Sequence, residues 1–173
     1  MIIVGATILF LIGRSFFGPT HSLIVICPET KSQCNSQGLF DAYSLTHIIH
    51  GLFFYFLLWL LARKLPLEVR LVLAIILETG WEVLENTDMV INRYRAETLS
   101  LNYFGDSILN SISDIALAFL GFWVARKLPI WASISFVFII EIGLALLIRD
   151  NLTLNIILLV FPIPAIQNWQ LGY

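Results

Sequence analysis

Apolar runs long enough to cross a lipid bilayer recur along most of this chain, and they limit the folds open to it. Hydrophobic residues make up 58% of its 173 residues and charged residues only 13%, whereas a soluble domain carries about 25% charge. Runs of this length favour helices, because a helix bonds every backbone amide within its own segment. We therefore predict an all-α fold: one polytopic membrane domain over 1–173, built as a helical bundle.

About six transmembrane helices are predicted from these runs. The predicted spans are 1–17, 43–62, 66–86, 106–125, 129–148 and 152–166. The last run contains Pro162 and Pro164, so a bend, an early stop or a re-entrant segment is an alternative to a full crossing there.

Two short basic turns indicate the orientation. Arg63 and Lys64 separate the second and third spans, and Arg126 and Lys127 separate the fourth and fifth. Such turns stay in the cytoplasm. Both termini would then be cytoplasmic if all six runs cross, and loops 18–42 and 87–105 would lie outside. The first outer loop holds both cysteines, Cys27 and Cys34; a disulfide and two free thiols remain alternatives.

An internal repeat is indicated by the sequence around these turns. Residues 62–66 and 125–129 both read ARKLP, and the following spans place Glu78 and Gly80 in register with Glu141 and Gly143. We expect a duplicated helical hairpin related by an axis along the membrane normal. A chance likeness between basic turns is the alternative.

Polar side chains gather in the outer half of the spans, while the inner half is almost wholly apolar. Glu78, Glu82 and Glu85 share one helical face at i, i+4 and i+7. Other faces carry His47 with His50, and Asp106, Asn110 with Asp114. At 1.5 Å per residue, Glu78 and Asp114 lie roughly 12–15 Å below the outer surface.

Lipid cannot solvate such carboxylates. Each ionised group costs about 2.5–3.5 kcal/mol at a helix centre, so several together approach the stability of a whole domain. They must be protonated, paired or metal-bound. We expect Glu82 and Asp114 to approach each other inside a polar chamber open to the outside, with His47 or His50 close by.

The chamber suggests a divalent metal ion as cofactor. The candidate ligands are His47, His50, Glu78, Glu82, Asp106 and Asp114, and the candidate catalytic residues are Glu82, Glu85, Asp114 and His50. Substrate contacts are expected from Asn110 and from outer arginines that suit a phosphate, namely Arg93, Arg95 and Arg149.

Structural roles are the alternative for most of these residues. The arginines and glutamates suit a buried ion-pair network, and the histidines suit hydrogen bonds between helices. Asp106 follows Gly105 and suits the N-cap of the fourth span. Glu141 suits a pairing with Arg149 or a protonated state.

Several blocks of the sequence resemble a known family. They are SLTHIIHGLFFYFLLWLL, ETGWEVLENTDMVINRYR, YFGDSILNSISDIAL, ARKLP and RDNLTLNIILL. They look like a family of small alphaproteobacterial inner-membrane proteins of unknown function, over about residues 41–172. That resemblance implies an inner-membrane location and no activity. More loosely, the order His, Glu, Arg, Asp, Asn is similar to the VanZ-like group.

Three classes of function fit the pattern. The first is a metal-dependent hydrolase or transferase on a lipid-linked or phosphate-bearing substrate. The second is a non-catalytic accessory or assembly subunit of a membrane complex, and the third is ion or proton transport. Membrane lipid is an expected partner, with a membrane-protein partner or a homodimer as further alternatives. The net charge of −2 offers no basic surface for nucleic acid.

Overall fold

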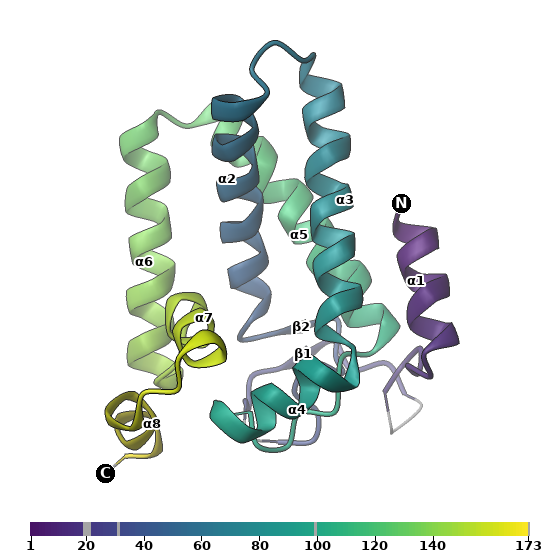
Figure 1. The fold of residues 1–173 in the computed structure, drawn as a ribbon, viewed down its shortest axis with the longest axis vertical. Helices are drawn as coiled ribbons and strands as arrows, with labels where there is room; N and C mark the ends of the chain where they lie inside the picture. The colour runs from purple at the N-terminus through teal and green to yellow at the C-terminus, as the bar shows by residue number, and fades with distance from the viewer. Residues whose placement is uncertain (19–21, 31, 99, 173) are drawn as a thin grey trace.

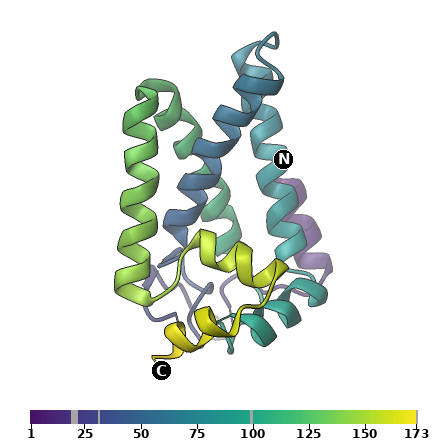
Figure 2. The same ribbon diagram turned by 60° about the vertical axis from the view of Figure 1, so that its left-hand side comes forward.

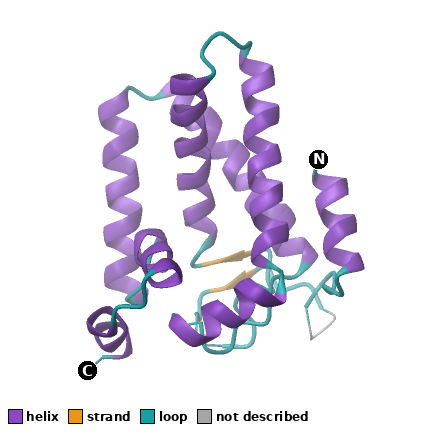
Figure 3. Ribbon diagram, viewed as in Figure 1, coloured by secondary structure: helices purple, strands orange, loops and turns teal. Residues whose placement is uncertain are grey.

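The computed structural model describes residues 1–18, 22–30, 32–98 and 100–172 as eight helices and one small sheet (Figure 1, Figure 3). The long helices are α2 (Ser44–Leu61), α3 (Leu67–Glu85), α5 (Ile108–Lys127) and α6 (Ile130–Ile148). The short helices are α1 (Ile2–Leu11), α4 (Asp88–Glu97), α7 (Leu152–Val160) and α8 (Pro164–Leu171). Strands β1 (Ile26–Cys27) and β2 (Phe40–Asp41) pair in parallel. The predicted all-α class is confirmed.

Within the described chain, α2, α5 and α6 are long and apolar enough to cross a membrane by length and composition. Only 17% of the α6 window is buried inside the protein. Large apolar side chains such as Phe138, Ile139 and Leu147 stand exposed along it. An apolar surface of this extent is typical of a helix that faces lipid.

Two of the predicted spans form shorter helices than the sequence suggested. The helix expected over 1–17 ends at Leu11, and Gly13 follows with φ +89°. The helix expected over 152–166 ends at Val160, and a break containing Pro162 precedes α8. A helix of about 10 residues reaches about 15 Å, half of a hydrocarbon core of about 30 Å. The count of about six crossings is therefore not confirmed.

The polar segments collect at one end of the bundle. Figure 1 shows the α2–α3 and α5–α6 turns at the upper end, and β1, β2, α4 and α8 at the lower end. The C-terminus lies at the lower end, and α1 starts beside the middle of α3. Figure 2 shows α7 crossing beneath the long helices. The structure thus does not support the expectation that both termini share the side of the basic turns.

The segment between α1 and α2 forms a cross-linked cover at the lower end. Cys27 and Cys34 form a disulfide with Cα atoms 5.9 Å apart, so the disulfide alternative holds. The cover is bound to the start of α5, because the Gln37 side-chain amide donates to the Gly105 carbonyl at 2.7 Å. The Ser107 amide also donates to the Ser36 carbonyl at 2.9 Å.

The helix caps differ from two expectations. Ser107, not Asp106, caps α5: its Oγ accepts a hydrogen bond from the Asn110 amide at 3.1 Å. Asp106 bonds instead to side chains outside α5. Glu141 accepts from the backbone amides of Leu152 at 3.1 Å and Thr153 at 3.0 Å. It therefore stabilises the N-terminus of α7, where a negative charge is favourable.

Helices α2 and α5 share the largest interface in the protein. Gly51 of α2 faces the backbone of Ala118, and Gly121 of α5 faces the backbone of Ile48. A Cβ atom on either glycine would overlap a carbonyl oxygen of the opposite helix. Small residues allow this close approach, as is common between helices in membranes. The contact brings the N-terminal halves of α2 and α5 together.

The duplicated hairpin is not confirmed and stays a prediction. The paired glutamates have different surroundings: Glu78 is fully buried, whereas Glu141 caps α7. A Cβ atom on Gly80 or Gly143 would meet nothing within 4 Å. Their matching positions therefore reflect no shared close contact between helices.

The glycine contact predicts a large difference between two alanine substitutions. Gly51→Ala should lower the free energy of unfolding by about 1–3 kcal/mol or more, because the added methyl overlaps a backbone that cannot yield easily. Gly80→Ala should be neutral or stabilising by up to about 1 kcal/mol, because alanine favours a helix and has free space there. Thermal unfolding in one detergent measures both variants. Equal effects would contradict the close approach of α2 and α5.

Asp150 joins three segments at the lower end. Its carboxylate accepts hydrogen bonds from the Tyr43 hydroxyl at 2.7 Å, the Gln170 side-chain amide at 2.9 Å and the Asn151 backbone amide at 2.9 Å. It is completely buried. Burial raises the pKa of Asp150 from 3.8 to about 6, although each of these hydrogen bonds lowers it. The folded protein therefore binds this proton more tightly than the unfolded chain does.

The raised pKa of Asp150 predicts a pH dependence of stability with a known sign. The free energy of unfolding should rise as the pH falls from 7 through 6 toward 4. Asp150→Asn mimics the protonated side chain. Its free energy of unfolding should therefore change less over this pH range than that of the wild type, by an amount on the order of 2–3 kcal/mol. Thermal unfolding between pH 7.5 and pH 5 compares the two proteins. Parallel curves would contradict the raised pKa.

Candidate functional site

The two histidines lie in the N-terminal half of α2, on the side facing α3 and α5. Asp41 fixes where α2 begins, because its carboxylate accepts from the Tyr43 amide at 2.8 Å and the Ser44 amide at 2.9 Å. His47 and His50 follow one helical turn apart, with ring centroids 5.0 Å apart. The helix start thereby sets the depth of both rings.

Glu78 on α3 binds both histidines. Its Oε1 lies 2.6 Å from His47 Nδ1, and its Oε2 lies 3.0 Å from His50 Nδ1. The Glu78 side chain is 0% exposed. A carboxylate only accepts hydrogen bonds, so each Nδ1 carries the proton in these contacts. The Nε2 atom of His47 is therefore free to bind something else.

Glu82 and Asp114 meet His47 in a second group. Glu82 Oε1 lies 3.4 Å from His47 Nδ1, and Asp114 Oδ2 lies 3.8 Å from His47 Nε2. One nitrogen or carboxylate oxygen from each of these three residues lies within 4.8 Å of the others. The structure thus contains the expected approach of Glu82 and Asp114 beside a histidine.

These carboxylates have unusual hydrogen bonding for buried groups. Both carboxylate oxygens of Glu82 and the Oδ1 atom of Asp114 have no hydrogen-bond partner within the described part of the chain. The Nδ2 atom of the neighbouring Asn110 also has none there. All three residues are at least nine-tenths buried. A buried carboxylate oxygen without a donor costs several kcal/mol, so such groups usually have a ligand.

The donor set fits a divalent transition metal such as zinc. Imidazole nitrogen and carboxylate oxygens are both ligands that zinc accepts, and three protein ligands leave a fourth position free in a tetrahedral site. Glu78 occupies the position of a carboxylate that orients a ligating histidine through its other ring nitrogen. The geometry thus favours His47, Glu82 and Asp114 as ligands and Glu78 as their support. His47, His50 and Glu78 form a second group with ligand atoms within 4.8 Å.

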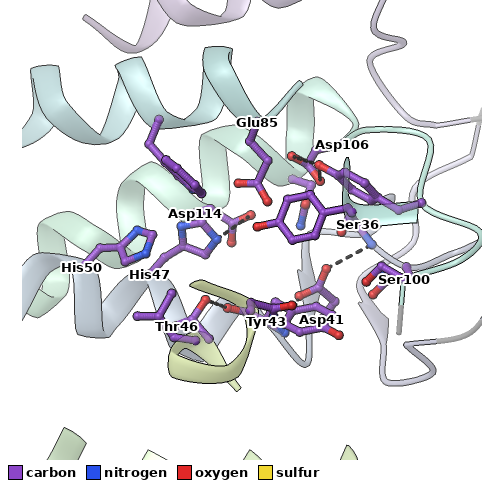
Figure 4. Close-up of a pocket in the computed structure, with 17 residues that line it drawn as sticks. Ser36, Asp41, Tyr43, Thr46, His47, His50, Glu85, Ser100, Asp106 and Asp114 are labelled. Carbon is purple, nitrogen blue, oxygen red and sulfur yellow. Dashed lines mark hydrogen bonds and ion pairs between the residues drawn. The ribbon is translucent and has the colours of Figure 1, made fainter. Parts of the chain in front are cut away.

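A polar cavity of about 50 Å³ opens beside this group. Figure 4 shows the side chains of His47, Asp114, Glu85 and Asp106 pointing into the same region. The cavity also touches the cover segment through Asn35, Ser36 and Asp41, and α7 through Leu152 and Asn155. Residues from the cover segment, from the loop before α5 and from five helices (α2, α3, α4, α5 and α7) therefore build its wall.

Asp106 lies on this wall but does not join the candidate metal ligands. Its carboxylate accepts from the Asn86 side-chain amide at 2.7 Å, and from the Tyr103 hydroxyl at 3.0 Å and 3.1 Å. The Asn86 side chain accepts in turn from the Asp106 amide at 2.7 Å. Burial raises the pKa of Asp106 to about 6, although these hydrogen bonds lower it. These contacts indicate that Asp106 joins α3 to the loop before α5.

The three outer arginines lie elsewhere. Arg93 bonds to the Leu159 carbonyl at 3.0 Å and pairs with Glu97 at 3.4 Å. Arg95 packs over the Phe104 ring, and Arg149 donates to the Trp169 carbonyl at 3.3 Å. The expected ion-pair network between these arginines and the buried glutamates is absent from the described residues. The expected phosphate clamp likewise does not line the cavity.

Several cavity residues were missed by reasoning from the sequence. Tyr94 and Tyr103 look like ordinary core aromatics, and they indeed pack with ring centroids 5.3 Å apart. Asn35 and Asn155 stand far apart in sequence and meet the cavity only through the fold. Asp41 stands three residues before Ser44 and the long apolar run that follows, a pattern that could have indicated a helix-starting residue.

Residues 9–172 match the model of a family described as "Protein of unknown function (DUF2585)". The chain belongs to this family. A UPF0314 protein of Paracoccus denitrificans (strain Pd 1222) is 45% identical over 170 residues, covering 98% of this chain and 88% of the relative. A UPF0314 protein of Rhizobium meliloti (strain 1021) is 50% identical over 142 residues, covering 82% and 72%. A third, from Agrobacterium fabrum (strain C58 / ATCC 33970), is 41% identical over 170 residues, covering 98% and 86%.

The resemblance to an uncharacterised alphaproteobacterial family is thereby confirmed. These matches show no link to the VanZ-like group. No solved structure matches the chain.

Proposed function

We propose that this protein is a metal-dependent hydrolase or transferase of the bacterial inner membrane, acting on a lipid-linked substrate at the outer leaflet. The single observation that carries the proposal is the group of His47, Glu82 and Asp114, which is buried and has three carboxylate oxygens that lack donors among the described residues. Among the described residues, neither Glu82 nor Asp114 pairs with a lysine or an arginine, and His47 is the one basic side chain beside both. A divalent cation would compensate all three at once.

The residues around the proposed metal have distinct roles. A bound divalent metal lowers the pKa of a coordinated water toward 7 and so supplies a nucleophile. Glu78 holds His47 in one orientation through the 2.6 Å contact to Nδ1, and His50 holds Glu78 from the other side at 3.0 Å. Removing the charge of Glu78 should therefore weaken metal binding rather than abolish it.

Two further side chains suit proton and charge handling. Glu85 lies on the cavity wall with its carboxylate toward Asp114 (Figure 4), where it would accept a proton from the attacking water. The Asn110 side-chain NH2 is buried without an acceptor in the described chain. It would donate to an oxyanion that forms during attack on a carbonyl or similar group.

The positions of the three arginines limit the class of substrate. Arg93, Arg95 and Arg149 bond to other parts of the protein, so recognition of a phosphate by these arginines finds no support. A lipid-linked substrate keeps its support, because the cavity lies in the outer half of helices whose apolar surfaces suit lipid.

The metal proposal predicts effects of different size on metal binding for two glutamine substitutions. Purified protein should hold about one divalent ion per chain, and Glu82→Gln should remove it while the protein stays folded. Glu78→Gln should lower metal affinity by about 10–100-fold. The matched control is Glu97→Gln, which removes a partly exposed carboxylate paired with Arg93 and should leave metal content unchanged. Elemental analysis and metal titration measure these effects.

Stability of the metal-free variants separates the proposal from a purely structural cluster, as expected of an accessory subunit. Without metal, Glu82→Gln should stabilise the fold, because it removes a buried charge that lacks donors. If Glu82 serves an ion pair with His47, the same change should destabilise by about 3–5 kcal/mol. The enzyme proposal would be overturned if the metal-free wild-type protein bound no ion after metal addition and Glu82→Gln showed this loss of stability.

The orientation in the membrane yields a separate prediction. The basic turns should face the cytoplasm, and the disulfide at the opposite end suits an oxidising compartment. Asn92 is exposed on α4 at the disulfide end. Asn92→Cys should react with an impermeant thiol reagent in intact spheroplasts, whereas Lys64→Cys should react only after permeabilisation. The reverse pattern would place the cavity on the cytoplasmic side.

A further inference from the structure

The cavity wall beyond the proposed metal ligands is rich in carboxylates and poor in basic side chains. Asp41, Glu85 and Asp106 line it, and none of its described lining residues is lysine or arginine. Its two histidines, His47 and His50, bond to glutamates of α3 instead. The three carboxylates therefore have no ion pair with a basic side chain among the described residues.

Unpartnered acceptor atoms face the same space. The side-chain oxygens of Asn35 and Asn155 are buried and have no hydrogen-bond partner among the described residues. These residues are only 6% and 7% exposed, and both line the cavity. The oxygens come from two segments, the cover and α7, so the arrangement is not a local turn. Each oxygen requires a donor that the protein does not supply.

Aromatic rings complete this part of the wall. Trp81, Tyr94 and Tyr103 all line the cavity, and aromatic faces attract ammonium groups. The carboxylates, the unpartnered oxygens and the aromatic rings therefore all favour a cationic ligand that donates hydrogen bonds.

We propose that the outer part of the cavity binds a protonated primary amine, so that the substrate of the proposed enzyme carries an ammonium group. An ammonium offers three donors and one positive charge, which suits the Asn35 and Asn155 oxygens and the carboxylates of Asp41, Glu85 and Asp106. The inference names the substrate class of the same site and rests on the proposed function for the reaction, but not for the binding.

The cavity size limits the group to a few heavy atoms. One water needs about 10–15 Å³ of such space, and the cavity measures about 50 Å³. An aminoethyl group fits this volume, whereas a whole lipid headgroup does not. The remainder of the ligand would stay outside the cavity, either in solvent or in the lipid phase.

Ethanolamine tests the proposal, with ethylene glycol as its neutral counterpart of the same length. Calorimetric titration of the purified protein in phosphatidylcholine nanodiscs should show ethanolamine binding at least about tenfold tighter than ethylene glycol, the discrimination expected when one buried charge pairing is lost. Inorganic phosphate should not bind. Equal binding of ethanolamine and ethylene glycol, or tighter binding of phosphate, would overturn the proposal.

Two variants locate the binding to the wall. Glu85→Gln should weaken ethanolamine binding by about tenfold, because it removes one of the unbalanced charges. Glu97→Gln removes a carboxylate that pairs with Arg93 outside the cavity and should leave the affinity unchanged. Asn35→Ala serves as a second test that keeps all charges. Unchanged ethanolamine affinity in both Glu85→Gln and Asn35→Ala would contradict the assigned site.

Metal and lipid conditions separate this proposal from the proposed function. Ethanolamine binding to protein that holds no metal under any condition would overturn the enzyme and leave the amine site. Metal binding without ethanolamine binding would overturn the amine site alone. Nanodiscs containing phosphatidylethanolamine identify the source: weaker apparent ethanolamine affinity indicates a lipid headgroup, and unchanged affinity indicates a free amine. Both of these results support an ammonium ligand.

Discussion

The close approach of α2 and α5 is the contact on which the site depends. Gly51 and Gly121 let each helix rest on the backbone of the other, and this distance brings the polar residues one or two turns outward within reach. His47 precedes Gly51 by one turn, and Asp114 precedes Gly121 by two. Longer side chains at the crossing would separate the helices and pull His47 Nε2 away from the Asp114 carboxylate, now 3.8 Å distant.

The polar groups divide into a satisfied set and an unsatisfied set. Glu78 and Asp106 have donors for both carboxylate oxygens, so they stabilise the folded protein. Glu82 and Asp114 keep oxygens without donors in the described chain. Natural proteins retain such groups mainly where function requires them. The division separates the residues that fix the geometry of the site from the residues available to the proposed metal ion.

Reasoning from the sequence found the parts governed by periodicity. Helical spacing placed Glu78 and Glu82 on one face, and the cost of burying charge placed them toward His47 and Asp114. It failed where the outcome depended on loop geometry. Asn35 and Tyr103 reach the cavity through segments without regular structure. Arg93 bonds to the Leu159 carbonyl of α7 and pairs with Glu97 rather than with the buried glutamates. The short lengths of α1 and α7 were also not predicted, because apolar composition does not show where a helix ends.

The disulfide of the cover segment connects the cavity wall to the order in which the protein matures. Asn35 and Ser36 follow Cys34 directly and form part of the cavity wall. The candidate catalytic residues lie on α2, α3 and α5, so a newly made chain carries them before the disulfide cross-links the cover segment. The disulfide forms only where thiols are oxidised. In the proposed orientation, a molecule inserted the other way round would carry the same helices but leave the cover without its cross-link. One covalent bond would then couple correct insertion to the completion of the cavity wall.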